Sequence, residues 1–251
     1  MSLGEHLVEL RKRLFIAGGA IIVGAIVGFF FAPYVIDAIR VPIDELALKR
    51  NATIMYTTVS GSFDLRIQIS FMIGIVATSA IWLYQIFAFL VPGLTGKEKR
   101  YTFGFFFSAV PLFLAGATLG WVIFPHTVEL LTSFSDPKDA TSLDAKSYYD
   151  FVIKLVLAIG VAFVLPVFIV LLNFVGVLSA KAVLSGWRIA LLVITIFTAL
   201  ATPAADPVTM VLLAVPMALL YFAAAGVAWL HDRRAAKRAA AIDAELALAS
   251  E

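Results

Sequence analysis

Two glutamates that stand among basic residues are the side chains in this sequence with the clearest chemical use. Glu9 lies in the N-terminal stretch GEHLVELRKR, and Glu98 lies in the stretch GKEKR. An ionised carboxylate matches the planar guanidinium group of arginine with two parallel hydrogen bonds, a geometry that a lysine ammonium lacks. One hypothesis is therefore that the two carboxylates bind cationic groups of a peptide ligand. Their basic neighbours would hold both segments at an anionic lipid surface.

Each glutamate also has a simpler interpretation. If the N-terminal stretch is a helix, its leucines recur at intervals of three and four residues and form one apolar stripe. Glu9 then faces Arg13 one turn later, and such an exposed pair contributes only about 0.3–0.5 kcal/mol. Glu98 would be an ordinary solvated loop charge. Composition alone favours these simpler interpretations.

Other chemistry finds little support in the residue types. The sequence has no cysteine and only three histidines, His6, His126 and His231, which lie far apart. Disulfides and thiol nucleophiles are therefore excluded, and a histidine-rich metal site is not expected. No nucleophile–base arrangement or glycine-rich phosphate loop is present, so we expect no enzyme activity, no metal and no cofactor. The net charge of +2 gives no case for a nucleic-acid partner.

The elements that must position these residues are membrane spans. The chain is 62% hydrophobic and only 14% charged, whereas soluble domains carry about a quarter charged residues. Uncharged runs near the 20 residues that a spanning helix needs predict an all-α domain over 1–230 with a C-terminal tail, 231–251. The six predicted spans lie near residues 14–36, 67–91, 102–125, 152–176, 187–203 and 207–230. The fifth is short, which is compatible with local thinning of the bilayer.

Two polar residues stand out within these spans. Gln85 lies in the aromatic-rich stretch IWLYQIFAFL, and Asp206 lies in the turn TPAADP between the last two runs. Asp206 suits the N-cap of a helix with Pro207 at its first position, and an ionisable residue at that depth is also a functional candidate. A single re-entrant element is the alternative to two short spans, which the prolines favour.

The distribution of basic residues predicts that both termini are cytoplasmic. With six spans the two termini share one side of the membrane, and the segments on that side hold 12 Lys and Arg residues against 6 in the two longer loops opposite. We expect those two outer loops, near 37–66 and 126–150, to form ordered caps, with ATIMYTTVSGSF extended. The tail HDRRAAKRAAAIDAELALASE is either a helix or a solvated, partly disordered segment, and we favour the second. The pairs Gly24-x-x-x-Gly28 and Gly116-x-x-x-Gly120 offer close helix contacts.

Several of these stretches together resemble the TatC family, the polytopic core of the twin-arginine protein translocase. The resemblance extends from Leu3 to Leu230. It rests on HLVELRKRL at the N-terminus, VP at 41–42, LYQIFAFLVPGLTGKEKR at 83–100, FVLP at 163–166, ATPAADPVTM at 201–210 and AVPMALLY at 214–221.

The resemblance implies a six-span, glove-like bundle with cytoplasmic termini in the plasma (cell inner) membrane of a prokaryote. It implies binding of the twin-arginine signal peptides of folded substrates, with export driven by the proton-motive force. The expected partners are the single-span subunits TatA and TatB, membrane lipids, and further copies in a hetero-oligomeric complex. The residues that match the signal-peptide-binding positions or flank them are Glu9, Glu98, Arg11, Lys97 and Arg100. Structural, partner-docking or intramembrane polar positions match Pro42, Phe63, Gln85 and Asp206.

The sequence departs from the family pattern at two places. Many relatives carry Glu or Gln in the fourth span where this chain has Val164, so a carboxylate role at that depth is not expected here. The turn TPAAD differs from the TPPD form of some relatives, which shifts Asp206 by one position.

Two other functions compete with the receptor hypothesis. A proton-coupled secondary transporter or channel would use Gln85 and Asp206, but few charges are available to relay protons and no internal repeat is evident. A purely structural membrane assembly factor is the third hypothesis.

Overall fold

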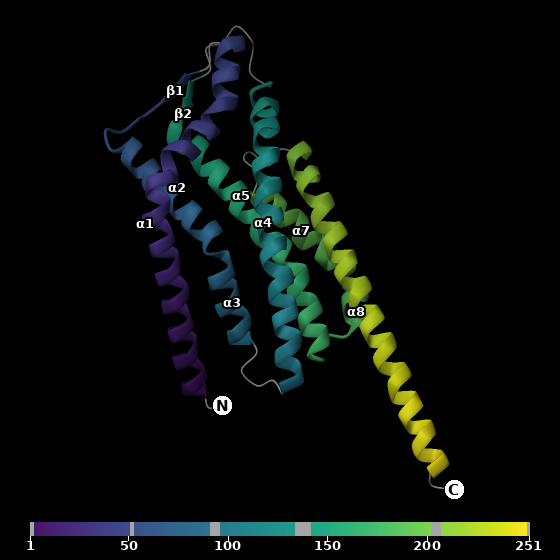
Figure 1. Cartoon of the computed structure of the whole chain (residues 1–251). Helices are drawn as coiled ribbons and strands as arrows, with labels where there is room; N and C mark the ends of the chain where they lie inside the picture. Colours follow the sequence, from purple (N-terminus) through teal and green to yellow (C-terminus); the bar gives the residue numbers. More distant parts are fainter. Residues whose placement is uncertain (1–2, 51–52, 91–95, 134–141, 202–206, 250–251) are drawn as a thin grey trace.

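The computed structural model describes residues 3–50, 53–90, 96–133, 142–201 and 207–249, and helices occupy almost all of them (Figure 1). The expected all-α class is confirmed for this part of the chain, with one pair of three-residue strands as the exception. The elements are α1 (Leu3–Arg50), β1 (Thr53–Met55), α2 (Gly61–Ala77), α3 (Ser79–Leu90), α4 (Gly96–Ser133), β2 (Ser142–Asp144), α5 (Ala145–Phe174), α6 (Ala180–Ser185), α7 (Trp187–Ala201) and α8 (Pro207–Ala249).

The long helices have the length and composition of membrane spans. Within the described ranges, α1, α4, α5 and α8 are each long and apolar enough to cross a membrane, and α2 and α3 pass the same test as a bent pair. α7 has 15 residues and is therefore about 22 Å long, less than the ~30 Å thickness of a hydrocarbon core. The chain is thus built as a multi-pass helical membrane protein, and the count of six spans stays a prediction.

α5 is the central helix of the bundle. In its most apolar stretch 56% of the residues are buried, against 17% for α1. α5 packs against α4, α8 and α2, and the largest apolar cluster joins α1, α2, α4 and α5. The largest side chains that are fully buried in this cluster include Ile39, Ile69, Phe124 and Tyr149. The remaining helices surround α5 and leave apolar side chains on the outside of the bundle.

Glycines let two pairs of helices approach closely, as the spacing of Gly24 with Gly28 and of Gly116 with Gly120 predicted. A Cβ atom on Gly28 of α1 would lie 2.7 Å from the carbonyl oxygen of Ser70 in α2. A Cβ on Gly116 of α4 would lie 2.7 Å from a carbonyl oxygen of α5. Both distances are too short for a real carbon, so the α1–α2 and α4–α5 contacts depend on the missing side chains.

The second predicted span, expected as one helix through 67–91, consists of two helices. α2 and α3 meet at Thr78 with an angle of 61° between them. The indole Nε1 of Trp82 donates to the carbonyl of Ile75 at 2.8 Å, and the Thr78 hydroxyl donates to the carbonyl of Gly74 at 2.7 Å. These side chains supply hydrogen bonds at the break, which allows the bend to lie within an apolar environment.

A charged side chain supplies a missing hydrogen bond in α1. Pro33 has no N–H, so the carbonyl of Phe29 four residues earlier loses its helical partner. The guanidinium of Arg66 in α2 donates to this carbonyl from Nε at 3.3 Å and from Nη2 at 3.2 Å. It also lies 4.1 Å from the centre of the Phe29 ring. Arg66 therefore joins α2 to α1 at the proline and contacts an aromatic face as well.

The end of the bundle away from the termini carries the two short strands (Figure 1). β1 and β2 pair in parallel, with Thr53 opposite Ser142 and Met55 opposite Asp144. Asp144 is also the N-cap of α5, where its carboxylate accepts from the backbone N–H of Ser147 at 2.9 Å. This hydrogen bond is the main cause that lowers the pKa of Asp144. The extended conformation expected for ATIMYTTVSGSF is confirmed at β1, whereas residues 61–63 of the same stretch begin α2.

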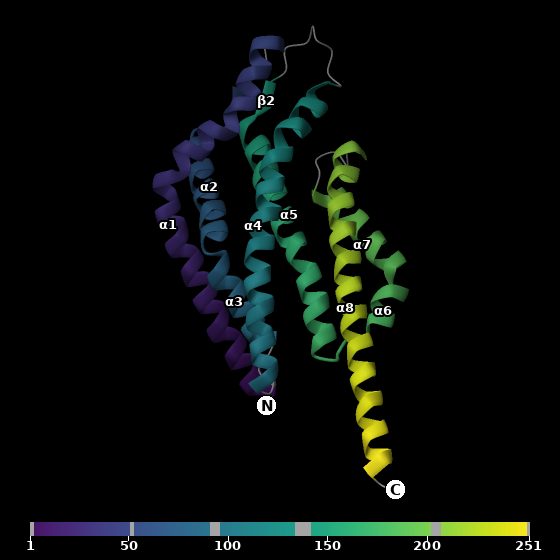
Figure 2. The same ribbon diagram turned by 45° about the vertical axis from the view of Figure 1, so that its right-hand side comes forward.

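The C-terminal tail is helical, which corrects the expected partly disordered segment. α8 continues without a break from the apolar run through Ala249 and projects beyond the rest of the bundle (Figure 2). Its described side chains from Arg233 to Asp243 are exposed. The two ends of the chain lie at the same end of the bundle (Figure 1).

A polar cluster joins the start of this tail to the bundle. The carboxylate of Asp232 accepts from the backbone N–H of Ala180 at 2.7 Å and from the amide of Asn173 at 2.9 Å. The ring of His231 stacks on Phe174, with 3.9 Å between ring centroids. α8 is thereby tied to the end of α5 and to the start of α6.

The pKa of Asp232 makes this contact sensitive to acid. The hydrogen bond from Ala180 is the main cause that lowers this pKa below the ordinary 3.8. A carboxylate whose pKa is lower in the folded state stabilises the fold at pH values above its unfolded-state pKa. This stabilisation is lost as the pH falls through the folded-state pKa. We expect Asp232→Asn to lower the melting temperature by about 2 °C at neutral pH. Thermal unfolding against pH should show the difference from wild type shrinking below pH 3.8; a difference independent of pH would contradict the assignment.

Candidate functional site

Glu9, Arg13 and Gln85 meet at the end of the bundle that holds the termini. α1 places Glu9 and Arg13 one helical turn apart, and α3 brings Gln85 against them from a distant part of the sequence. The Nε and Nη2 atoms of Arg13 both donate to Oε1 of Glu9, the first at 3.0 Å. The Nη1 atom of Arg13 donates to Oε1 of Gln85 at 3.5 Å, the weakest of the three contacts. The three nitrogens of one guanidinium thus bridge two helices.

These three residues line a groove. Its volume is about 760 Å³, and its walls come from one face of α1 and from α3. The lining residues are Gly4, Glu5, Val8, Glu9, Lys12, Arg13, Ile16 and Gln85. Both charge signs are present, and Val8 and Ile16 add an apolar strip. The groove can therefore take an extended peptide segment that carries a positive charge beside an apolar side chain.

The second carboxylate oxygen of Glu9 has no hydrogen-bond partner. The atom Oε2 is buried, and no donor within the described part of the chain reaches it. The side chain as a whole is 20% exposed, but Oε2 itself is enclosed. Leaving a buried acceptor unpaired costs about 1–3 kcal/mol, and more when the acceptor is charged. An incoming N–H donor would remove this cost, which makes Oε2 the chemically most receptive atom of the groove.

Aromatic contacts hold α3 in place beside the groove. His6 of α1 stacks on Phe89 of α3, with 4.5 Å between ring centroids and 23° between ring planes. Phe87 of α3 stacks on Phe168 of α5 with 4.6 Å between centroids. These two stacks link α3 both to the N-terminal helix and to the central helix, so the position of Gln85 is fixed from two sides.

Comparison with known proteins identifies the family. The family model described as Sec-independent protein translocase protein (TatC) matches residues 5–216, most of the chain. The chain belongs to the TatC family. A TatC protein of Xylanimonas cellulosilytica is 43% identical over 242 residues, which cover 96% of this chain and 88% of the relative. A TatC protein of Rothia mucilaginosa is 34% identical, with 93% of this chain and 81% of the relative covered.

Solved TatC structures share the fold. A crystal structure of the twin arginine translocase receptor TatC in DDM matches with a TM-score of 0.77 at 28% identity and covers 89% of this chain and 99% of that one. A second crystal structure of the same receptor matches with a TM-score of 0.75. The resemblance inferred from the sequence motifs is thereby confirmed. The family is a component of a protein translocase and not a family of enzymes, which favours the first of the three functional hypotheses.

The structure brings together some of the TatC residues predicted from sequence and separates others. Glu9 and Gln85, expected in different roles, lie in the same groove. Arg11 is exposed on α1 and does not line it. Pro42 lies in the part of α1 near the strands, and Phe63, which is 60% exposed, lies in the first turn of α2. Those two residues belong to the opposite end of the bundle and cannot contact a ligand in the groove.

The second predicted carboxylate belongs to the first turn of α4. The backbone of Gly96–Arg100 is helical. The side chains of Glu98, Lys97 and Arg100 fall outside the described part of the structure, as does Asp206 entirely. Their roles stay predictions.

The fourth-span residue Val164 lies in an apolar part of the core. Val164 is 2% exposed and packs in an apolar cluster with Phe87, Phe113 and Leu171. A carboxylate here would be surrounded by aromatic and aliphatic side chains. The same cluster includes Phe87 of α3, so in this chain the position stabilises the helix that carries Gln85.

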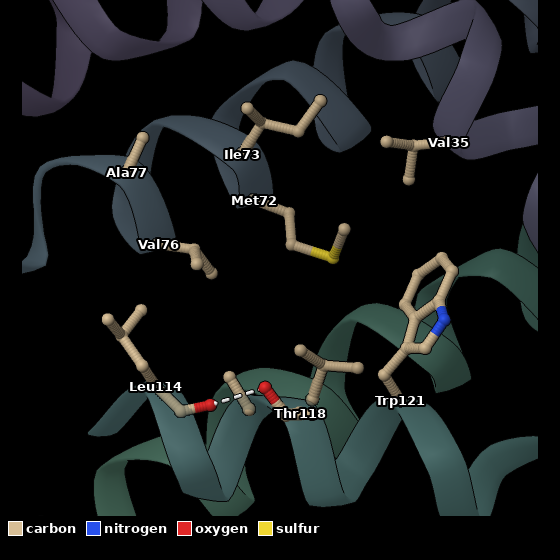
Figure 3. A pocket seen from close by; sticks show the side chains of 10 residues that line it. Val35, Met72, Ile73, Val76, Ala77, Leu114, Thr118 and Trp121 are labelled. Carbon is tan, nitrogen blue, oxygen red and sulfur yellow. Dashed lines mark hydrogen bonds between the residues drawn. The ribbon is translucent and has the colours of Figure 1, made fainter. Parts of the chain in front are cut away.

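A second hollow lies between α2 and α4 and is almost entirely apolar. Figure 3 shows Met72, Val76 and Ala77 of α2 across from Leu114 and Trp121 of α4. The volume is about 340 Å³. The hydroxyl of Thr118, which also lines the hollow, is used locally, because it donates to the carbonyl of Leu114 at 2.8 Å. The hollow therefore offers apolar surface and no acid–base chemistry. Elsewhere in the described residues, no group of three His, Asp or Glu side chains could hold a metal ion.

The sequence did not predict one contact inside the groove and one beside it. Arg13 was considered only as the partner of Glu9 in an ordinary helix pair, and the stack of His6 on Phe89 was not foreseen. The spacing of Glu9 and Arg13 was visible in the sequence, but the participation of Gln85 required the position of α3, which residue types do not give.

Proposed function

We propose that this chain is the twin-arginine signal-peptide receptor and core scaffold of the Tat translocase, and that Glu9 binds an arginine of the signal peptide. The observation that supports this most directly is the buried Oε2 atom of Glu9, which has no partner and lines a groove. The solved relatives are described as twin arginine translocase receptors, which agrees with the proposal.

The chemistry of the groove suits a guanidinium better than an ammonium. A guanidinium offers donors in a fixed planar fork, so one arginine can reach Oε2 of Glu9 and a second acceptor together. The other oxygen of the same carboxylate, Oε1, is such an acceptor, because it already takes two guanidinium hydrogen bonds from Arg13. Glu98 on the first turn of α4 is proposed to bind the second arginine, with Arg11, Lys97 and Arg100 setting the charge at the lipid surface.

The expected topology follows from the distribution of charge. Both chain ends lie at one end of the bundle (Figure 1), and the segments assigned to that side carry the excess of Lys and Arg. We therefore propose six spans with cytoplasmic termini in a prokaryotic plasma membrane, and a groove that opens toward the cytoplasm. Folded substrates would be exported with TatA and TatB as partner subunits and the proton-motive force as the source of energy. Pro42, Phe63 and Asp206 are proposed to act in the fold or in partner contacts at the other side.

The proposal is tested with a fluorescent twin-arginine signal peptide and the purified full chain in nanodiscs. We expect saturable binding of this peptide. The same peptide with both arginines replaced by lysine should bind with an affinity at least about tenfold lower. Equal affinity for the two peptides would contradict recognition of guanidinium groups. Absence of binding to the chain alone, with binding restored by an added TatB, would place the receptor site in the complex and not in this groove.

A further inference from the structure

Arg13 occupies the place in the groove where a ligand's arginine would bind. Its Nε and Nη2 atoms both donate to Oε1 of Glu9, and its Nη1 atom lies 3.5 Å from Oε1 of Gln85. The side chain is 24% exposed, so most of it is enclosed by the groove that it helps to line. Arg13 therefore donates to the Glu9 carboxylate, which is the group that the proposed function assigns to binding an arginine of the signal peptide.

This arrangement leaves one oxygen of the carboxylate unpaired. A guanidinium pairs with a carboxylate most strongly when it donates to both oxygens in parallel. Arg13 uses only Oε1, while Oε2 stays buried and unpaired. A peptide arginine reaches the enclosed Oε2 only when neighbouring side chains of the groove move aside, and it gains the two-oxygen geometry only if Arg13 leaves Oε1.

Gln85 gives Arg13 an alternative partner. The Nη1–Oε1 distance of 3.5 Å is at the outer limit of a hydrogen bond, so a small movement of the Arg13 side chain toward α3 would shorten it. A glutamine oxygen is a neutral acceptor and holds a guanidinium less strongly than a carboxylate does. Arg13 thus has a preferred partner in Glu9 and a weaker one within reach.

We propose that Arg13 is an intramolecular competitor for the signal-peptide site. It pairs with Glu9 in the peptide-free chain and transfers to Gln85 when a peptide arginine takes the carboxylate. The inference rests on the proposed function. It adds that a peptide must supply enough binding free energy to displace Arg13 from Glu9, which sets a threshold for binding. A pair between residues four apart on a partly exposed helix surface is weak, so the threshold is low enough for the intended peptide to overcome.

The test is the affinity of the full chain in nanodiscs for the fluorescent twin-arginine peptide. We expect Arg13→Gln to bind the peptide about threefold to tenfold more tightly than wild type, because the competitor is gone. Lys12→Gln is the matched control. It removes one positive charge from the same groove, and Lys12 makes no hydrogen bond to Glu9 in the described structure, so its affinity should rise less than about twofold. A gain in affinity is not an outcome that misfolding would produce, and Arg13→Met serves as a second variant with the same expectation.

A double variant tests the transfer to Gln85. Gln85→Leu alone should weaken peptide binding, because Arg13 then has no second partner, whereas Gln85→Leu combined with Arg13→Gln should bind like Arg13→Gln alone. Additive effects would overturn the transfer step. If wild type prefers the arginine peptide to the lysine peptide but Arg13→Gln binds no more tightly than Lys12→Gln, the competitor role is wrong while the receptor function stands. If wild type shows no preference, both proposals fail together.

Discussion

Glu9→Gln is expected to weaken binding of a twin-arginine signal peptide by roughly 10- to 100-fold. The substitution keeps the size and shape of the side chain but removes the charge and one acceptor, and hydrogen bonds to charged groups contribute about 1.5–3 kcal/mol. The unpaired Oε2 atom is the acceptor that the variant lacks. The measurement is fluorescence anisotropy of a labelled peptide with the full chain in nanodiscs.

The control is Glu45→Gln at the far end of the same helix. Glu45 is exposed and lies outside the groove, so its replacement removes the same charge without touching the site. We expect this variant to bind the peptide as wild type does. Glu9→Gln and Glu45→Gln with the same affinity would contradict the assignment of Glu9, provided that both variants keep the helical circular dichroism and melting temperature of wild type.

Gly74→Ala is expected to destabilise the bundle by about 1–3 kcal/mol, the largest effect on stability among the changes considered. A Cβ atom at this position would lie 2.6 Å from the backbone nitrogen of Ala25 and 2.8 Å from the carbonyl oxygen of Ile21. Both obstacles are backbone atoms of α1, so neither can rotate away and the helices must separate. The same separation would shift α1 against α3 and weaken the contact between Arg13 and Gln85.

The matched control is Gly18→Ala on α1, where a Cβ would meet nothing within 4 Å. We expect this variant to be as stable as wild type or more stable, since alanine is favoured over glycine within a helix by up to about 1 kcal/mol. Thermal unfolding of the two variants under the same conditions is the measurement. A Gly74→Ala variant that melts together with Gly18→Ala would show that the α1–α2 contact relaxes at no cost.

The sequence predicted which side chains have chemistry and only part of how they meet. Glu9 stood out because a carboxylate among basic residues is unnecessary for anchoring a helix at a membrane. Gln85 stood out as a polar residue among aromatic ones. That the two share a groove depends on the bend at Thr78, and no proline or glycine at that residue marks it in the sequence. The hydrogen bond of Trp82 to Ile75 that accompanies the bend is a tertiary detail which hydropathy does not encode.

For the C-terminal tail the prediction was wrong for a local reason, because the intrinsic helix propensity of its residues was given too little weight. Its alanine, arginine, lysine and leucine content has high intrinsic helix propensity, and this favours a helix over the partly disordered segment that was expected. A helix that continues from a formed span needs no new nucleus, so propagation alone suffices. The structure accordingly extends α8 to Ala249, and Asp232 ties its exit from the bundle to α5 and α6.

Site-specific photo-crosslinking of a twin-arginine peptide to the full chain tests the central claim most directly. A photoreactive amino acid would replace Val8 or Ile16 in the groove, one residue of the 95–100 segment, or Phe63 at the opposite end of the bundle. We predict crosslinks from the groove and from 95–100 that disappear when both arginines of the peptide are replaced by lysine, and none from Phe63. Crosslinks at Phe63 with none at Val8 or Ile16 would contradict a binding site formed by Glu9 at the N-terminal end of α1.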